Sequence, residues 1–408
     1  MIEDLTDTWY NRGVQPESIA PDSPGAVLRL VRSGQAASRS DIARLTHVSA
    51  STAATRVEAL IGLGFLHETG AGRSRGGRRP RQLELRTDAG LVAAADLGAN
   101  HASLAVFDLG GALLAEQVLP MDIADGPDRV LAWVVDQVRT MSDARSAAGT
   151  RSAGARPVPL RGLTVGVPGP VDFRAGRVVS PSRMPGWNGA DVPALAGAFT
   201  DVPVLVENDA NLMALGEFSA VPSEHLVFLK AGSGIGCGVI ASGQLHRGAR
   251  GAAGDISHAP VSDQQDVPCS CGRTGCLDAV ASGAALARRL AEAGFDVQGT
   301  SGVVRIARDA EPVSARMFRD AGRATADVLA TIVNFFNPDT LVLGGQLSQA
   351  EPYVANIRST LYERCLPMAV EKLVIAPSRA GRLAGVIGGG HLMLEHLFDP
   401  GRVNALVP

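Results

Sequence analysis

The stretch LVAAADLGANHASLAVFDL, residues 91–109, contains two short apolar runs separated by a turn with Gly98 and Asn100. Similar runs follow it, and most end in glycine, aspartate or asparagine: GLTVGVPG at 162–169, VPVLVEND at 202–209, HLVFLKAG at 225–232, CGVIASG at 237–243 and TLVLGG at 340–345. Such runs predict β-strands. Helical spacing at 127–141, 283–293 and 314–336 separates some of them, so an α/β body is expected from Leu91 onward. Residues 145–157 predict a flexible surface loop inside this body.

The chain of 408 residues is long enough for two or three domains, and 46% hydrophobic residues with 4% aromatic residues are typical of a globular α/β protein. The formal net charge of −3 gives the whole chain no bias toward polyanions, so a local basic cluster is more informative. No run of 18 apolar residues occurs, and the acidic start MIEDLTDTWY is unlike a signal peptide. We therefore expect a cytoplasmic protein.

Residues 23–88 predict a winged helix-turn-helix domain, preceded by a flexible arm at 1–22. Ser23 and Pro24 form a helix start, a second short helix opens at Ser40, and Ser49 caps a third helix. Strands at 65–68 and 82–85 enclose a loop rich in glycine and arginine. Three short helices followed by two strands around a loop are the plan of a winged helix-turn-helix.

The third helix and the loop carry the residue types that bind DNA. Ser51, Thr52 and Arg56 lie away from the apolar face of the helix, where they could contact base edges in the major groove. The candidate backbone or minor-groove contacts of the wing are Arg75, Arg78 and Arg79. Three-helix units also serve as protein-docking modules, and an arginine-rich loop can be an ordinary solvated surface. The combination of both features favours DNA binding.

The segment HAPVSDQQDVPCSCGRTGC, residues 258–276, predicts a structural zinc site. Three thiolates and one imidazole, from Cys269, Cys271, Cys276 and His258, form a typical closed tetrahedral donor set. The alternative is three reduced, buried cysteines beside an unrelated histidine, but cysteines this close together across glycines pack poorly in a core. Cys237 and Cys365 stand alone in the sequence and are expected to be ordinary core residues.

Several motifs together resemble the ROK family (repressors, open reading frames and kinases). They are VENDANLMALGE at 206–217, GARGAAGDISH at 248–258 and CSCGRTGCLDAVASG at 269–283, supported by GVPGPVD at 166–172, PGWNG at 185–189, AGSGIGCGVI at 231–240, FNPDTLVLGG at 336–345 and AGVIGGG at 384–390. With the N-terminal head, they resemble the repressor branch. The resemblance implies that residues 89–408 form the two lobes of an actin-like (ribonuclease-H-like) ATPase fold, with a sugar in the cleft between them.

The resemblance also implies sugar-binding residues. The family holds sugar hydroxyls with an Asn-Asp pair, here Asn208 and Asp209, although Asp209 could also cap the helix expected at 210–217. Further contacts come from positions matching Asp255, His258 and Asp278. The family often has glutamate at the two acidic positions, so both carboxylates here are one methylene shorter. This difference leaves the identity of the sugar open.

The residues expected to face ATP phosphates depart from the kinase pattern. Kinase members carry DxGGTK or DxGxT in the first loop, whereas this chain keeps Asp96 and Gly98 but has Asn100 at the threonine position and no lysine after it. The second loop keeps Gly232 and Gly234. Asp209 would be the catalytic base if the protein were a kinase. The altered first loop favours a non-catalytic regulator.

We therefore expect a sugar-responsive transcriptional regulator, a repressor of carbohydrate genes, with structural Zn²⁺. Its partners would be an inverted-repeat DNA operator, a sugar effector and further copies of itself in a homodimer or homotetramer, without a membrane. One alternative is an ATP-dependent, glucokinase-like sugar kinase with an accessory DNA-binding domain. Another is a regulator without a small ligand.

Overall fold

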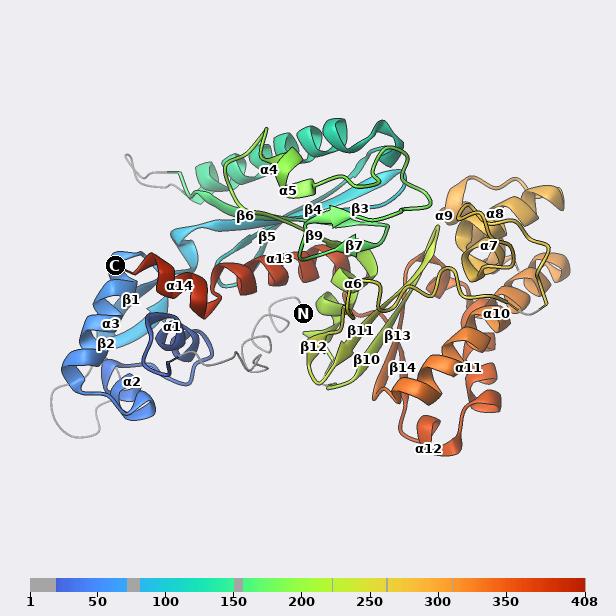
Figure 1. Cartoon of the computed structure of the whole chain (residues 1–408). Coiled ribbons are helices and arrows are strands. Elements are labelled where there is room, and N and C mark those ends of the chain that lie inside the picture. Colours follow the sequence, from blue (N-terminus) through green and yellow to red (C-terminus); the bar gives the residue numbers. More distant parts are fainter. Residues whose placement is uncertain are drawn as a thin grey trace.

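The computed structural model describes residues 20–71, 81–149, 157–221, 223–261, 263–309 and 311–407. The molecule is elongated, with an N-terminal head at one end followed by two lobes, each built on a five-stranded sheet (Figure 1). The α/β body expected from Leu91 and the three helices with two strands ahead of it are both present.

The head consists of α1 (Pro24–Arg32), α2 (Arg39–Thr46), α3 (Ala50–Gly62), β1 (Leu66–Ala71) and β2 (Arg81–Leu85). Each helix begins after a serine whose hydroxyl accepts a hydrogen bond from a backbone N–H two or three residues into the helix, a cap that stabilises a helix by about 1 kcal/mol. The caps at Ser23 and Ser49 are confirmed. The predicted start of the second helix at Ser40 is wrong, because Ser38 is the cap and the helix opens at Arg39.

The first lobe has the strand order β5-β4-β3-β6-β9. The strands are β3 (Leu91–Leu97), β4 (His101–Asp108), β5 (Leu113–Pro120), β6 (Leu160–Val167) and β9 (Val204–Asn208), with a small hairpin of β7 (Val171–Asp172) and β8 (Arg177–Val178). Helices α4 (Pro127–Gly149) and α5 (Val192–Ala196) lie on one side of the sheet, and α13 (Ala384–Leu397) lies on the other (Figure 1). Residues 145–149 therefore belong to a helix, so the predicted loop at 145–157 began too early.

The second lobe has the strand order β12-β11-β10-β13-β14. Its strands are β10 (Leu226–Ala231), β11 (Ile235–Ala241), β12 (Gln244–Leu245), β13 (Thr340–Gly344) and β14 (Val374–Pro377). Its helices are α6 (Asp209–Phe218), α7 (Leu277–Ala281), α8 (Gly283–Glu292), α9 (Gly299–Arg308), α10 (Pro312–Phe336), α11 (Glu351–Arg364) and α12 (Pro367–Val370). Along β10, Val227 and Leu229 face the core beneath α10, whereas Leu226 and Phe228 face α6. Because side chains alternate along a strand, Lys230 falls on the α6 side.

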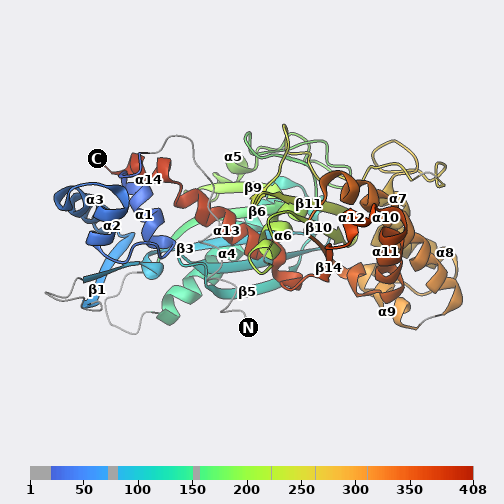
Figure 2. The same ribbon diagram turned by 90° about the horizontal axis from the view of Figure 1, so that it is seen from below.

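Helices α6 and α13 cross in close contact where the two lobes meet (Figure 2). A Cβ atom added at Gly388 would overlap the carbonyl oxygen of Leu212, and one added at Gly216 would overlap the carbonyl oxygen of Ala384. The two helix backbones are therefore in contact, and only glycine fits at either position.

The head and the first lobe share one hydrophobic core, which contains residues of α1 and α3 together with residues of β3, β4 and α13. The last helix, α14 (Pro400–Leu406), packs on α1, and the rings of Phe65 and Phe398 meet edge to face at 5.9 Å. Arg32 Nη2 lies 2.6 Å from Glu395 Oε1 at the end of α13. A single helix, α13, thus begins at the lobe boundary and ends against the head. No helix within the described ranges is long and apolar enough to cross a membrane.

Candidate functional site

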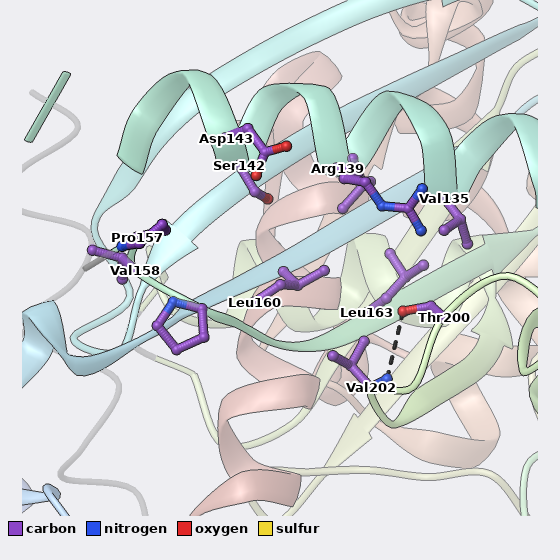
Figure 3. A pocket seen from close by; sticks show the side chains of 12 residues that line it. Val135, Arg139, Ser142, Asp143, Pro157, Val158, Leu160, Leu163, Thr200 and Val202 are labelled. Atoms are coloured by element: carbon purple, nitrogen blue, oxygen red, sulfur yellow. Dashed lines mark hydrogen bonds between the residues drawn. The ribbon is translucent and has the colours of Figure 1, made fainter. Parts of the chain in front are cut away.

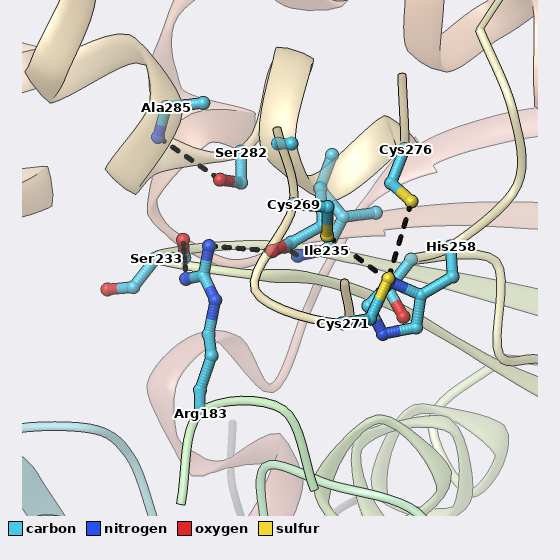
Figure 4. Close-up of polar contacts among 12 residues, drawn as sticks. Arg183, Ser233, Ile235, His258, Cys269, Cys271, Cys276, Ser282 and Ala285 are labelled. Carbon is cyan, nitrogen blue, oxygen red and sulfur yellow. Dashed lines mark hydrogen bonds and ion pairs between the residues drawn. The ribbon is translucent and has the colours of Figure 1, made fainter. Parts of the chain in front are cut away.

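Three cysteines and one histidine of the second lobe form a metal-ligand cluster. The sulfur atoms of Cys269, Cys271 and Cys276 and a ring nitrogen of His258 all lie within 4.8 Å of one another. Cys269 Sγ is 3.6 Å from His258 Nδ1, and Cys271 Sγ is 3.7 Å from Cys276 Sγ (Figure 4). In a tetrahedron with Zn–S bonds of about 2.3 Å, neighbouring sulfurs are about 3.8 Å apart. The donor set and its spacing therefore fit one tetrahedral ion.

Tight turns bring the sulfurs of this cluster together. The backbone N–H of Cys269 donates to the carbonyl of Arg273 at 2.8 Å, and that of Gly272 donates to Cys269 at 3.0 Å. Gly272 and Gly275 have φ angles of 86° and 66°, a left-handed conformation that favours glycine. Both turns therefore depend on glycine.

The surroundings of the sulfurs give the cysteine thiols different pKa values. The backbone N–H of Arg273 donates to Cys271, which lowers the pKa of that thiol to about 6, whereas burial raises the pKa of Cys276 to about 12. A bound dication would favour the thiolate form of both. Cys237 and Cys365 lie apart from the cluster and are buried, as expected.

The predicted sugar residues Asn208 and Asp209 lie at the junction of β9 and α6, where the two lobes meet. Asn208 is the N-cap of α6, because its side chain accepts a hydrogen bond from the backbone N–H of Asn211 at 3.2 Å. The capping role considered for Asp209 is therefore wrong. Asp209 is the first residue of the helix, and its Oδ1 accepts from Ala210 N–H at 2.7 Å.

The other carboxylate oxygen of Asp209 is bound by a buried lysine that was not among the predicted site residues. Lys230, at the end of β10 in the second lobe, donates through Nζ to Asp209 Oδ2. Asp96, at the end of β3, faces the same pair. Burial, followed by the neighbouring charge of Asp209, raises the pKa of Asp96 to about 7, and the ammonium of Lys230 partly offsets this rise. Asp209 thus contacts the ammonium of Lys230 directly, and Asp96 of the first lobe acts on it electrostatically.

Asp278 is also engaged by protein groups. It lies in α7 and is 3% exposed. Its Oδ1 accepts from the backbone N–H of Ile235 at 2.9 Å, and its Oδ2 is 2.6 Å from Arg183 Nη2 of the first lobe (Figure 4). Arg183 also donates to the carbonyl of Ser233 at 3.0 Å. A sugar hydroxyl could reach Asp278 only by sharing it with Arg183 or displacing Arg183.

Asp255 and His258 lie on one segment of the second lobe. Asp255 is exposed, and its Oδ1 accepts both the hydroxyl and the backbone N–H of Ser257. His258 is partly buried within the metal-ligand cluster. The carbonyl of Ser257 accepts from Asp278 N–H at 2.9 Å. The three second-lobe residues predicted to contact sugar are thus linked through the backbone beside the cluster.

A second charged pair between the lobes, besides Arg183 and Asp278, involves Glu207, the residue before Asn208. Its carboxylate is almost fully buried, and Oε2 lies 2.6 Å from Nε of Arg247 in the second lobe. The guanidinium of Arg247 also lies 4.0 Å from the centre of the Phe173 ring. None of Glu207, Arg247, Arg183 and Lys230 was among the site residues predicted from the sequence. Two signals were available in the sequence. Glu207 lies within the motif VENDANLMALGE, and Lys230 is a single lysine in an apolar strand.

The two loops expected to face phosphates make contacts within the protein, although Ala99, Asn100 and Ser233 are exposed. A Cβ atom at Gly98 would lie 2.6 Å from His101 Cε1, so the imidazole rests on the first loop. Burial and the charge of Lys230 lower the pKa of His101. In the second loop, Gly232 N–H donates to the carbonyl of Gly234 at 3.0 Å, and Ser233 Oγ is 2.9 Å from Thr300 Oγ1.

In the head, Ser51 and Thr52 lie in the first turn of α3, with Ser51 exposed and Thr52 partly buried. Arg56 lies one turn further along the helix, 3.8 Å from Asp22. The wing residues Arg75, Arg78 and Arg79 fall outside the described residues.

A cavity of about 470 Å³ lies elsewhere, between α4 and β6 on the first lobe (Figure 3). Its walls are mostly apolar and include Val135, Leu163 and Val202, with Arg139 and Asp143 at the side of α4. It lies on the opposite side of the first sheet from α13, so it contains none of the predicted site residues.

Comparison with known proteins identifies relatives of the whole chain. The model of the ROK family matches residues 92–396. A xylose repressor of Caldicellulosiruptor bescii is 27% identical over 381 residues, covering 89% of this chain and 92% of its own. A glucokinase of Thermotoga maritima is 28% identical over 321 residues, covering 74% of this chain and 96% of its own.

Among solved structures, a ROK family transcriptional regulator described as a homologue of the Escherichia coli Mlc protein has the same fold. Its TM-score is 0.75 at 23% identity, with 94% of this chain and 98% of that chain covered. This similarity covers the head as well as the two lobes.

Proposed function

The chain belongs to the ROK family, and from that premise we propose that it is a sugar-responsive, DNA-binding transcriptional regulator that represses carbohydrate genes. The observation that carries the proposal is how much of this chain each group of relatives covers. Xylose repressors align with 89% of this chain and therefore with part of the head, whereas glucokinases align with 74%. A sugar kinase has no use for a winged helix-turn-helix, but a regulator requires a DNA-binding domain.

The proposed DNA interface is α3 together with the wing. Ser51, Thr52 and Arg56 would contact the major groove, and the arginines of the wing, Arg75, Arg78 and Arg79, would contact phosphates or the minor groove. Two copies of the chain, or two pairs, would place their α3 helices on the two halves of an inverted repeat. The proposed location of this activity is the cytoplasm.

The proposed effector is a neutral sugar held at the lobe boundary by Asn208, Asp209, Asp255, His258 and Asp278. Buried carboxylates outnumber the cations here, because Asp96, Asp209, Glu207 and Asp278 face Lys230, Arg183 and Arg247. Each of these three cations is already paired with a carboxylate, which disfavours sugar phosphates and sugar acids. Because the repressor relatives are xylose repressors, xylose and other pentoses come first in a ligand screen.

Helix α13 is the proposed route from the sugar to the DNA. Its first turn packs against Asp96, its middle crosses α6 at Gly388, and its end contacts Arg32 of the head. Sugar binding at the N-terminus of α6 would shift α13, and α13 cannot move without moving the head. A rigid helix packed against elements of both sites is a physical basis for coupling them.

The test of this function is selection of bound DNA from a random pool with the full chain. We expect enrichment of an inverted repeat, and we expect Thr52→Ala to change the preferred bases while leaving the stability of the protein nearly unchanged. Failure of the wild-type chain to enrich any sequence would contradict the proposal.

We further propose that the metal-ligand cluster holds one structural Zn²⁺ per chain, which fixes the loop carrying His258 and the turn into Asp278. Cys271→Ser is expected to remove the metal and to abolish sugar binding. Cys365→Ser, which alters a buried cysteine outside the cluster, should retain both. Elemental analysis and ligand-induced thermal shifts measure the two effects. Chelator-free wild-type protein without zinc would show the assignment to be wrong.

The alternative is a sugar kinase, which the glucokinase relatives and the presence of Asp96 and Asp209 favour. Asn100 and His101 in the first loop count against it, as does the ion pair at Asp209. Incubation with ATP and the sugar found by screening distinguishes the two, because a kinase releases ADP at the rate of sugar phosphorylation.

A further inference from the structure

Lys230 lies in a place where a lysine is unexpected. The chain has only two lysines, and its other Lys/Arg residues are all arginines. Lys230 lies near the end of an apolar strand. Its side chain is 17% exposed, and that of its partner Asp209 is 5% exposed. The alternation of β10 directs it toward α6, away from the large core of the second lobe.

Four titratable groups from different elements act on the ammonium. Asp209 of α6 contacts it directly, and Asp96 of β3, Asp278 of α7 and His101 of β4 interact with it electrostatically. Burial by itself would lower the pKa of Lys230, but the three carboxylates outweigh it and raise that pKa above its ordinary value. Lys230 is therefore a permanent cation at the point where the two lobes meet.

This point also lies between the two phosphate loops. Asp96 ends the strand that leads into Gly98, and Lys230 stands two residues before Gly232. In phosphoryl transfer, carboxylates at such a position hold a divalent cation that neutralises the phosphates, and a free carboxylate accepts the proton of the attacking hydroxyl. Here the ammonium binds Asp209 Oδ2 and so supplies the charge that a metal ion would, while Ala210 N–H binds Oδ1. Each oxygen keeps one acceptor site for a sugar hydroxyl.

We propose that Lys230 is a built-in cation that takes the place of a metal ion between Asp96 and Asp209, so that this boundary binds sugar without a metal–nucleotide complex. The inference deepens the proposed regulator and rests on it for the role of the sugar. It also explains how a ROK chain with both aspartates intact can be a sensor. The positive charge that a bound metal ion supplies in a kinase is here supplied by a side chain of the protein.

The first arm of the test removes the cation. Lys230→Ser leaves Asp96 and Asp209 buried together without a counter-charge, so Mg²⁺ or Mn²⁺ should raise its thermal midpoint by several degrees. The wild-type protein and Lys372→Ser, which alters the other, exposed lysine, should not respond. Adding Asp96→Asn to Lys230→Ser should abolish the response, because a ligand of the metal is lost. A Lys230→Ser protein that is indifferent to divalent cations would overturn the proposal.

The second arm needs no variant and remains decisive if Lys230→Ser fails to fold. Calorimetric titration of the wild-type chain with a non-hydrolysable ATP analogue and Mg²⁺, with and without sugar, should show no saturable binding. Binding in the micromolar range, as expected of a working kinase, would overturn the proposal. Neither arm measures operator affinity, so failure of the Lys230 assignment is distinguishable from failure of the regulator function.

Discussion

Replacing Gly388 with alanine is expected to lower the free energy of unfolding by about 3 kcal/mol, at the upper end for overpacking a close contact. The added methyl group would overlap the carbonyl of Leu212, a backbone atom that cannot rotate away. Helix α13 would have to separate from α6, which would also loosen the route proposed between sugar and DNA. Denaturant unfolding measures the loss of stability, and operator affinity with and without sugar measures the loss of coupling.

The matched control is Gly302→Ala, which adds the same methyl group to a buried glycine in helix α9. There the nearest atoms, in Val297, are 3.6 Å away, an ordinary van der Waals distance. The higher helix propensity of alanine should leave the protein as stable as the wild type or more stable by about 1 kcal/mol. Equal stability of the two variants would contradict the close crossing of α6 and α13.

Phe398→Ala is expected to have the second large effect, because this residue joins the end of α13 to the head. Its ring is 4% exposed, meets Phe65 edge to face, and lies 4.7 Å from the guanidinium of Arg32. Truncation should cost about 3–5 kcal/mol, as buried phenylalanines typically do. We expect the variant to bind sugar normally but to lose the change in operator affinity that sugar causes.

Phe318→Ala provides the control for simple destabilisation. Phe318 is fully buried in α10, in the core of the second lobe and outside the core that the head shares. Its loss should cost a similar free energy and leave the coupling between sugar and operator intact. If Phe398→Ala kept its sugar response while Phe318→Ala lost it, α13 would not be the route.

Features encoded by neighbouring residues were predictable from the sequence. The serine caps of α1 and α3 depend on a hydroxyl and an N–H only a few residues apart, and the metal-ligand cluster depends on turns at Gly272 and Gly275. The apolar runs of β3, β4, β6, β9, β10 and β13 were recognisable because their buried residues are continuous. Strand β5 was missed because its side chains are mostly half-exposed or exposed and lack such a run.

Features that depend on distant pairing were not predictable. Arg183 meets Asp278 and Arg247 meets Glu207 only after the two lobes come together, and Lys230 meets Asp209 only after α6 packs on β10. Sequence motifs placed the aspartates near a sugar, but they could not identify the cations from distant parts of the chain that engage them. The core shared by the head and the first lobe was likewise hidden, since it joins residues from both ends of the chain.

The most direct test of the account is the affinity of the wild-type chain for its operator, measured by fluorescence anisotropy with and without a saturating concentration of the sugar. The coupling proposed through α13 predicts a change of about 5- to 150-fold, and saturating operator must change the affinity for sugar by the same factor. An operator affinity that stays the same when the sugar is bound would contradict the account.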